Sequence, residues 1–318
     1  MFLKRSKLSN PSRARLRPVT DTSLRPVTRF APSPSGFLHL GHALAAYVAH
    51  DSAREAGGRF LVRIEDIDST RCRPEYEMAI LEDLAWLGLA WEQPVLRQSE
   101  RAPAYAAALA RLEDLRLLYP CFCTRADIRA EIARSPSAPH GPEGALYPGT
   151  CRGLADGDRA SRIAAGIPYA MRIDVTKAQS LVGKLAWRDA RVGFVAATPA
   201  ALGDVVLARK GISTSYHLAV VVDDAYQGVT LVTRGMDLFH ATHMHRLLQA
   251  VLGLPEPVYH HHDLVVGDDG KRLATRDGAT ALRALREQGW TPDDVRRRIG
   301  WESEGTAAPA MAARTNRP

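Results

Sequence analysis

The stretch Arg29-Phe-Ala-Pro-Ser-Pro-Ser-Gly-Phe-Leu-His-Leu-Gly-His42 decides the fold of this 318-residue chain. It follows an apolar segment that is typical of a strand, and it leads into an alanine-rich segment that predicts a helix. In a parallel sheet, ligands bind at the end of such a strand, and the next helix offers free N–H groups to phosphate. His39 and His42 lie at this helix start, and Gly41 permits a nucleotide to approach the backbone closely. A helix cap with two incidental histidines is the alternative.

The segments around this stretch alternate between strand-like and helix-like patterns. Such an alternation predicts an α/β fold with a parallel sheet and crossover helices. Residues 119–151, which prolines interrupt, are expected to be irregular, and residues 168–210 alternate in the manner of strands. Further strands are predicted at 27–32, 59–64, 228–232 and 259–266, and helices at 41–56, 75–87, 102–118, 216–225 and 237–252.

The stretch from Arg29 to His42 resembles the HIGH signature of the class I aminoacyl-tRNA synthetases, and its first eight residues resemble their glutamyl branch. The resemblance implies a ligase with a Rossmann-type parallel-sheet fold. It also implies that ATP, with Mg²⁺, is a substrate. It further implies that His39 and His42 are catalytic and that they bind ATP together with Gly41.

Three segments resemble the parts of that family that bind glutamate. They are the opening of the first stretch at Arg29, residues 63–68 and residues 215–238. A substrate with two carboxylates suits arginine, because the guanidinium group binds carboxylate bidentately. Glu65 would accept hydrogen bonds from the substrate ammonium group, whereas a solvated acidic turn is the alternative for that position. The glutamate-binding residues that the resemblance implies are Arg29, Phe30, Ala31, Pro32, Ser33, Glu65, Tyr216 and Arg234.

Two adjacent carboxylates, Asp223 and Asp224, lie near the end of the helix predicted at 216–225. A negative charge is electrostatically unfavourable at the C-terminus of a helix. The pair therefore indicates a function without indicating which one. Ordinary residues at a helix end are the alternative.

Three of the four cysteines lie in one stretch of 31 residues. In a chain without a secretory signal, such clustering indicates metal binding, and zinc requires four ligands in a structural site. The pattern Cys-x-Cys followed by Tyr-x-x-x-Cys resembles the site of the glutamyl-queuosine-tRNA(Asp) synthetases. His140 is a competing fourth ligand, and three reduced buried cysteines without metal are the alternative. The resemblance implies one structural Zn²⁺ on Cys121, Cys123, Tyr147 and Cys151.

Residues 267–278 occupy the place of the KMSKS loop, which clamps the ATP phosphates in this family. Arg272 takes the position of the first lysine and is expected to be catalytic, whereas Thr275 replaces the second lysine. Loss of a charged transition-state contact costs roughly 2.7–4 kcal/mol, so Thr275 weakens the expected clamp. Lys271 and Arg276 carry positive charges on either side of these two positions. The loop residues expected to bind ATP are Lys271, Arg272 and Thr275.

Composition adds limits on the class of protein. Hydrophobic residues make up 46% and charged residues 24%, which is typical of a globular enzyme, and no apolar run is long enough to span a membrane. A cytoplasmic monomer is therefore expected. The net charge of +7 does not indicate an RNA-binding surface, because residues 1–28 carry seven basic side chains and only Asp21 against them.

The resemblance and the chain length together predict the domain organisation. Residues 1–24 are interpreted as a disordered basic extension or a misplaced start codon, with contact to tRNA phosphates as the alternative. The other predicted parts are two halves of a catalytic domain (25–100 and 206–290), an inserted α+β subdomain (101–205) with a zinc knuckle (119–152), and a short tail (291–318) without an anticodon-binding domain.

Three functions follow from these observations. The first is ATP-dependent formation of glutamyl-AMP and transfer of glutamate to the queuosine base in the anticodon of tRNA(Asp). Its implied partners are L-glutamate, ATP and queuosine-containing tRNA(Asp). The second is a truncated glutamyl-tRNA synthetase that charges the tRNA 3′ end. The third is a pseudoenzyme that binds glutamate, ATP or tRNA without catalysis, which the Thr275 replacement motivates.

Overall fold

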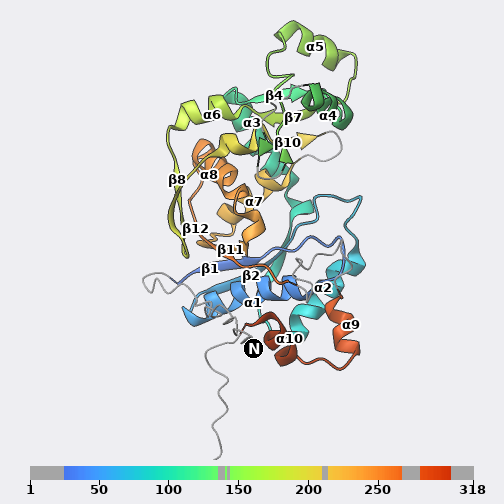
Figure 1. Cartoon of the computed structure of the whole chain (residues 1–318), viewed down its shortest axis with the longest axis vertical. Helices are drawn as coiled ribbons and strands as arrows, with labels where there is room; N and C mark the ends of the chain where they lie inside the picture. The colour runs from blue at the N-terminus through green and yellow to red at the C-terminus, as the bar shows by residue number, and fades with distance from the viewer. Residues whose placement is uncertain (1–24, 135–139, 142–143, 210–213, 267–279, 302–318) are drawn as a thin grey trace, which may run out of the picture.

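A computed structural model describes most of the chain, and the elements named below lie in the described residues (Figure 1). The predicted basic extension and the KMSKS-like loop, with Lys271, Arg272, Thr275 and Arg276, lie outside them. The described residues are 25–134, 140–141, 144–209, 214–266 and 280–301, with side chains omitted for 132–145.

A parallel sheet forms the centre of the molecule, as the alternating pattern predicts. It consists of two parts, β1-β2-β3 and β11-β12-β8-β9, and every pair in them is parallel except β8 with β9. The two parts meet where the Thr230 N–H donates to the Val27 carbonyl oxygen at 3.0 Å. The strands are β1 (Val27–Phe30), β2 (Arg59–Ile64), β3 (Glu92–Arg97), β8 (Ala186–Asp189), β9 (Gly193–Ala196), β11 (Leu231–Gly235) and β12 (Val258–His262).

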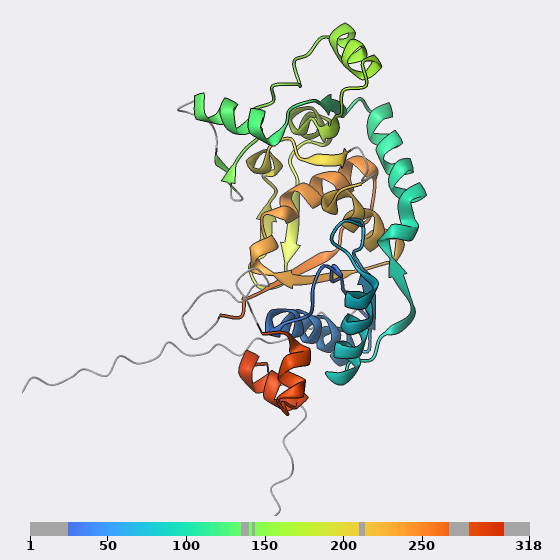
Figure 2. The same ribbon diagram turned by 90° about the vertical axis from the view of Figure 1, so that its right-hand side faces the viewer.

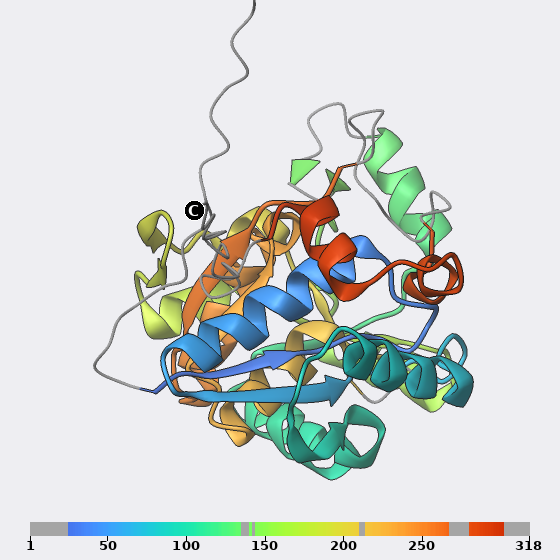
Figure 3. The same ribbon diagram turned by 90° about the horizontal axis from the view of Figure 1, so that it is seen from below.

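Helices cover both faces of this sheet. α1 (Leu40–Glu55) lies along one face and crosses the strands (Figure 3), while α7 (Tyr216–Tyr226) and α8 (Ala241–Leu252) lie on the other face (Figure 1). Small buried residues, Ala43, Ala46, Ala49 and Ala53, let α1 approach the sheet closely.

The polypeptide turns tightly between α1 and β2 at Gly58. A Cβ atom there would overlap the Pro26 carbonyl oxygen, so glycine is required at this position.

Three further helices pack beneath the sheet, next to α1 (Figure 2). They are α2 (Pro74–Trp86), α9 (Leu282–Glu287) and α10 (Pro292–Ile299). Asp51 of α1 accepts hydrogen bonds from Arg296 at 3.1 Å and from the Trp301 indole at 2.8 Å, and it ties the chain after residue 290 to α1. Part of the predicted tail therefore belongs to the core around α1, in which Val295 and Trp301 are buried.

A second, antiparallel sheet lies above the first and has the order β10-β7-β4 (Figures 1 and 2). Strand β8 lies within the predicted inserted subdomain but pairs with β12 of the main sheet. Strand β10 lies beyond the predicted boundary at residue 205 but pairs with β7. The remaining elements are β4 (Leu118–Cys121), β5 (His140–Gly141), β6 (Gly144–Ala145), β7 (Ala170–Ile173), β10 (Val206–Arg209), α3 (Ala102–Asp114), α4 (Arg125–Arg134), α5 (Asp156–Ala164), α6 (Val175–Val182), η1 (Gln98–Arg101), η2 (Pro199–Leu202) and η3 (Met236–Leu238).

Two local predictions are wrong. The region 119–151, expected to be irregular, contains helix α4, whose start is stabilised because the Asp127 carboxylate accepts from the Thr124 N–H at 2.8 Å. The region 168–210, expected to be strands, contains helix α6, which Asp174 caps by accepting from the Lys177 N–H at 2.9 Å. In both cases a carboxylate accepts a backbone N–H at the start of the helix and stabilises it. None of the described helices has the length and apolarity needed to cross a bilayer.

Candidate active site

A cleft of about 1150 Å³ opens at the C-terminal ends of the main-sheet strands. The loop between β1 and α1 forms one wall, and residues that follow β11 and β12 form another. Four residues of the predicted site line this cleft: Ser33, His39, Gly41 and His42. The placement at the carboxyl edge of a parallel sheet, next to a helix N-terminus, suits a phosphate-bearing ligand.

Backbone hydrogen bonds orient both histidines of the cleft. The His39 Nδ1 accepts from the Gly41 N–H at 3.1 Å, and the His42 Nδ1 accepts from the His39 N–H at 3.2 Å. Because each Nδ1 is an acceptor, each neutral ring carries its proton on Nε2. Burial, and secondarily the neighbouring His39, lower the pKa of His42 to about 3, which keeps His42 neutral at physiological pH. The start of α1 therefore presents its imidazoles as N–H donors.

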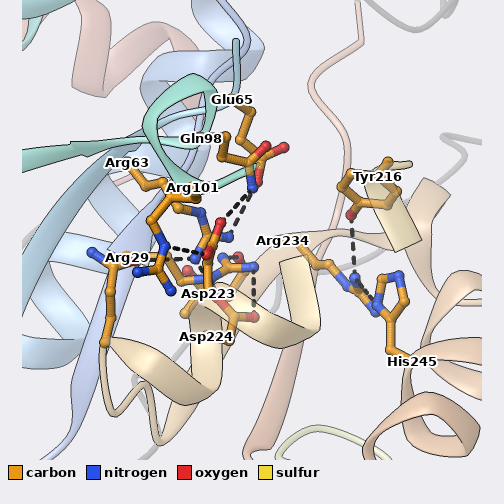
Figure 4. A network of polar contacts seen from close by, with 12 residues as sticks. Arg29, Arg63, Glu65, Gln98, Arg101, Tyr216, Asp223, Asp224, Arg234 and His245 are labelled. Atoms are coloured by element: carbon orange, nitrogen blue, oxygen red, sulfur yellow. Dashed lines mark hydrogen bonds and ion pairs between the residues drawn. The ribbon is translucent and has the colours of Figure 1, made fainter. Parts of the chain in front are cut away.

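A buried ion-pair network lies beside the cleft, at the junction of β1, β2 and α7 (Figure 4). Arg29 contacts Asp224 at 2.9 Å and donates to the Thr233 carbonyl oxygen at 3.1 Å. Arg63, which is fully buried, contacts Asp224 at 2.7 Å and Glu65 at 3.1 Å. Two arginines thus meet two carboxylates, and we call these four residues the paired cluster.

The two carboxylates of the paired cluster respond differently to this setting. Burial acts to raise the pKa of Asp224, but Arg29 and Arg63 outweigh it and hold this pKa below the ordinary value. Burial raises the pKa of Glu65, although Arg63 and Arg29 act against the rise. Asp224 is therefore the fixed counter-ion of both arginines, whereas the ionised form of Glu65 would gain from one more cationic partner.

The second arginine site is built around Arg234 on β11, which is 5% exposed. Its guanidinium donates to the His261 Nε2 at 3.1 Å, the His245 Nδ1 at 3.0 Å and the Tyr216 hydroxyl at 3.4 Å, and it also contacts the Thr242 hydroxyl. Figure 4 shows Arg234 between Tyr216 and His245, apart from the paired cluster. Among the described residues, no carboxylate forms an ion pair with Arg234.

The histidines around Arg234 stay neutral. Burial, and then the Arg234 charge, lower the pKa of His245 well below its usual range and that of His217 to about 4. Burial also lowers the pKa of His261. The surroundings of Arg234 therefore supply hydrogen-bond acceptors without compensating its charge, and a buried cation in that state favours an anionic ligand.

Other predicted residues of the first loop are placed mainly through their backbone. Phe30 is 6% exposed and packs in the core around α1, so its side chain faces away from the cleft. The Pro32 carbonyl oxygen accepts from the Glu65 N–H at 2.9 Å and links the first loop to the end of β2. Ala31 lies between these two residues and does not line the cleft.

The three clustered cysteines come together as the spacing suggests. The sulfur atoms of Cys121, Cys123 and Cys151 lie within 4.8 Å of one another. The Tyr147 hydroxyl lies 3.8 Å from the Cys123 sulfur and accepts from the Cys151 N–H at 2.8 Å. The side chain of His140 lies outside the described residues. Three thiols in one small volume suit zinc, which structural sites bind through cysteine sulfur.

Several residues at this site escape sequence reasoning. Arg71 and Arg73 line the cleft, and Arg71 contacts Asp68 at 3.0 Å. His245 and His261 carry no pattern of their own in the sequence, and Arg63 begins a segment that resembles the family's second strand but receives no role from it. The doublet Asp223-Asp224 is the one available signal, because its position at a helix end is unfavourable unless cations meet it.

Comparisons with known proteins agree with this geometry. Residues 26–310 match the family model described as tRNA synthetases class I (E and Q), catalytic domain. The glutamyl-Q tRNA(Asp) synthetase of Rhodobacter capsulatus is 53% identical over 86% of this chain and 99% of its own length. That of Nocardia farcinica is 46% identical over 84% of this chain and 81% of its own.

Solved structures show the same fold. The glutamate tRNA ligase of Elizabethkingia meningosepticum, in complex with its amino acid, superposes with a TM-score of 0.68 at 29% identity. The match covers 80% of this chain and 53% of the ligase, so the chain spans about half the length of that protein. The predicted α/β class I synthetase fold with its parallel sheet is confirmed. The chain therefore belongs to the class I tRNA synthetases (E and Q), an aminoacyl-tRNA synthetase family of ligases, and its relatives include proteins named glutamyl-Q tRNA(Asp) synthetase.

Proposed function

We propose that the protein activates L-glutamate with ATP and transfers the glutamyl group to the queuosine base in the anticodon of tRNA(Asp). The observation that carries glutamate activation is Arg234, a buried arginine surrounded by neutral acceptors next to a cleft with two histidines at a helix N-terminus. The names of the relatives from Rhodobacter capsulatus and Nocardia farcinica support the choice of acceptor.

The two arginine sites support the proposed binding of glutamate. The side-chain carboxylate would pair with Arg234 and Tyr216, because this is the buried cation without a carboxylate partner among the described residues. The substrate ammonium group would contact Glu65, and its charge would offset the burial that raises the pKa of Glu65. Arg29 and Ser33 would border the same substrate, with the backbone of Phe30, Ala31 and Pro32 holding the loop in place.

ATP would lie in the cleft along the start of α1. An α-carboxylate oxygen of glutamate would attack the α-phosphorus, forming a P–O bond as the bond to pyrophosphate breaks. His39 and His42 would donate N–H groups to phosphate oxygens, and the backbone at Gly41 would approach the phosphates. Lys271, Arg272 and Thr275 are proposed to contact the departing pyrophosphate, and Mg²⁺ would shield its charge.

The proposed acceptor of the glutamyl group, the queuosine base of tRNA(Asp), can be tested directly. ATP–pyrophosphate exchange with glutamate in the absence of tRNA measures activation, and a His39→Ala/His42→Ala variant is its control. Transfer of labelled glutamate to queuosine-containing and queuosine-free tRNA(Asp) measures the acceptor. Exchange together with queuosine-dependent transfer is expected. Charging of the 3′ end of tRNA would instead identify a glutamate–tRNA ligase, and absence of exchange above the control would identify a non-catalytic binding protein.

We further propose that Cys121, Cys123, Cys151 and Tyr147 hold one structural Zn²⁺. The proximity of the three sulfur atoms and the tyrosine hydroxyl supports this donor set. The metal would fix the connection between β4 and α5. One zinc per chain is expected by elemental analysis, and a Tyr147→Phe variant is expected to bind it more weakly. Full zinc retention in that variant would remove Tyr147 as the fourth ligand.

A further inference from the structure

The hydrogen bonds that Arg234 donates fix the ring protons of the histidines that accept them, and the Thr242 hydroxyl, 3.2 Å from the His261 Nε2, can donate to the same lone pair. An arginine side chain can donate but cannot accept, so every nitrogen that faces it must be an acceptor. The His261 Nε2 and the His245 Nδ1 must therefore both be unprotonated. His245 then carries its proton on Nε2, which faces the His217 Nδ1 at 3.2 Å.

A carboxylate from another strand enforces this arrangement at His261. The Asp189 Oδ2 lies 2.7 Å from the His261 Nδ1 and also accepts from the His261 N–H at 3.2 Å. Asp189 lies at the end of β8, next to β12, and it is 1% exposed. Because the carboxylate is an acceptor only, the His261 proton stays on Nδ1 and the Nε2 lone pair points to Arg234.

We propose that Asp189 is a positioning residue for glutamate binding, acting through His261 to hold the Arg234 guanidinium in place. Asp189 contacts neither the cleft nor Arg234 itself, and its effect passes through the tautomer of one imidazole ring. This proposal rests on the proposed function, since it takes Arg234 as the group that binds the substrate carboxylate.

The structure predicts what an Asp189→Asn substitution does. The Asp189 Oδ1 accepts from the backbone N–H groups of Arg191 and Val192 at 2.8 and 3.2 Å, and an asparagine oxygen can keep both bonds. An amide NH₂ would then replace the oxygen that faces His261, and the His261 backbone N–H would lose the same acceptor. His261 would move its proton to Nε2 to accept from the amide, and that proton would point at the Arg234 Nε–H. Two donors cannot bond, so Arg234 would lose one of its supports.

The test uses the full chain and combines kinetics with NMR. Asp189→Asn is expected to raise the KM for glutamate in ATP–pyrophosphate exchange about tenfold, the effect of one lost hydrogen bond to a charged group, while the KM for ATP changes less than about twofold. The matched control is Asp204→Asn. Asp204 is equally buried and likewise accepts from a backbone N–H, that of Val175, but it lies away from the cleft. Both variants are compared by thermal unfolding.

The imidazole ¹⁵N shifts of His261, assigned by their loss in a His261→Gln variant, report the tautomer without substrate. Protonation on Nδ1 in the wild type and a shift of the proton to Nε2 in Asp189→Asn are expected. Protonation on Nε2 in the wild type would overturn the proposal, even if the variant fails to fold. Equal changes in both KM values, or an unchanged KM for glutamate, would also overturn it. Absence of glutamate-dependent exchange in the wild type would instead contradict the proposed function.

Discussion

The paired cluster and the Arg234 site use the same side chain in opposite ways. In the paired cluster, Arg29 and Arg63 meet the carboxylates of Asp224 and Glu65 at 2.7 to 3.1 Å. Around Arg234, the partners are neutral imidazoles and hydroxyl groups. Both sites are buried, so the difference lies in charge compensation and not in exposure to solvent.

This difference separates a structural role from a binding role. A buried arginine that is paired with carboxylates holds strands and helices together, and breaking the pair leaves an uncompensated charge. A buried arginine with neutral acceptors is held in place by hydrogen bonds, but its charge is not compensated. It can therefore pair with an anionic ligand. The comparison therefore predicts that mutations of Asp224, the counter-ion of the paired cluster, act mainly on stability and that mutations at Arg234 act mainly on glutamate binding.

The largest effect is expected for Asp224→Asn. This change leaves Arg29 and Arg63 with a single carboxylate between them, so the free energy of unfolding should fall by about 3–5 kcal/mol. Chemical denaturation followed by circular dichroism measures the loss. A stability within about 1 kcal/mol of the wild type, the range of an ordinary hydrogen bond, would show that the cluster is not a structural support.

Arg234→Gln is expected to weaken glutamate binding and to leave the stability of the fold intact. Removal of one partner of a buried charge pair costs roughly 2–5 kcal/mol, so kcat/KM for glutamate should fall about 100-fold or more. Stability should be unchanged or higher, because the substitution removes a buried charge that has no carboxylate partner in the described part of the chain. Arg234→Lys is the control that retains charge but loses the planar fork, and it should recover little of the activity. Equal glutamate kinetics in Arg234→Gln and the wild type would refute the assignment of this site.

As the pH falls, the histidines around Arg234 should become protonated before the Asp224 carboxylate does. An ordinary histidine titrates near pH 6.5, but the folded protein lowers the pKa of His217 to about 4. The contribution of neutral His217 to stability is therefore complete above pH 6.5 and is lost as the pH falls from 6.5 to about 4. Asp224 stays ionised throughout that window, because its pKa lies below the ordinary value.

The corresponding measurement is the KM for glutamate between pH 8 and pH 4.5. Because burial and the Arg234 charge also lower the pKa of His245, and burial lowers that of His261, the profile should show no inflection near pH 6.5. The KM should rise only towards the acidic end, where a protonated ring would place an N–H against the Arg234 guanidinium. A clear inflection near pH 6.5 would mean that the rings around Arg234 titrate freely.

The smallest effect is expected for Tyr216→Phe. The Tyr216 hydroxyl lies 3.4 Å from Arg234, the longest of the hydrogen bonds at this site. Loss of one such bond is worth about 0.5–1.5 kcal/mol, so the KM for glutamate should rise roughly twofold to tenfold. An unchanged KM for glutamate would contradict the proposed contact of the Tyr216 hydroxyl with the substrate carboxylate.

Sequence reasoning located most of the elements around the site but not the partners within it. The helix after the Arg29–His42 stretch and the strand at 59–64 follow from local patterns, and the structure contains both. The proximity of Cys121, Cys123 and Cys151 was also expected from their spacing. The pairing of Arg29 with Asp224 spans 195 positions, and no local pattern reports a contact at that separation.

Two further features depend on tertiary contacts alone. Residues 292–301 have few apolar side chains and were expected to form a short tail, yet Val295 and Trp301 enter the core because Asp51 binds Arg296 and the Trp301 indole. His261 lies in the strand predicted at 259–266, and its role depends on Asp189 of a strand that belongs to a different predicted part of the chain.

The sequence by itself determined the kind of molecule: an α/β synthetase core, a helix start with His39 and His42, and a set of arginines suited to a dicarboxylate. Those features are local, because strand and helix periods, helix caps and short motifs are set by neighbouring residues. Only the tertiary structure decided which buried arginine is paired with carboxylates and which is surrounded by neutral acceptors. Charge compensation depends on carboxylates and imidazoles brought together from distant strands, and the folded arrangement alone shows Asp224 between Arg29 and Arg63 while Arg234 lies among neutral histidines.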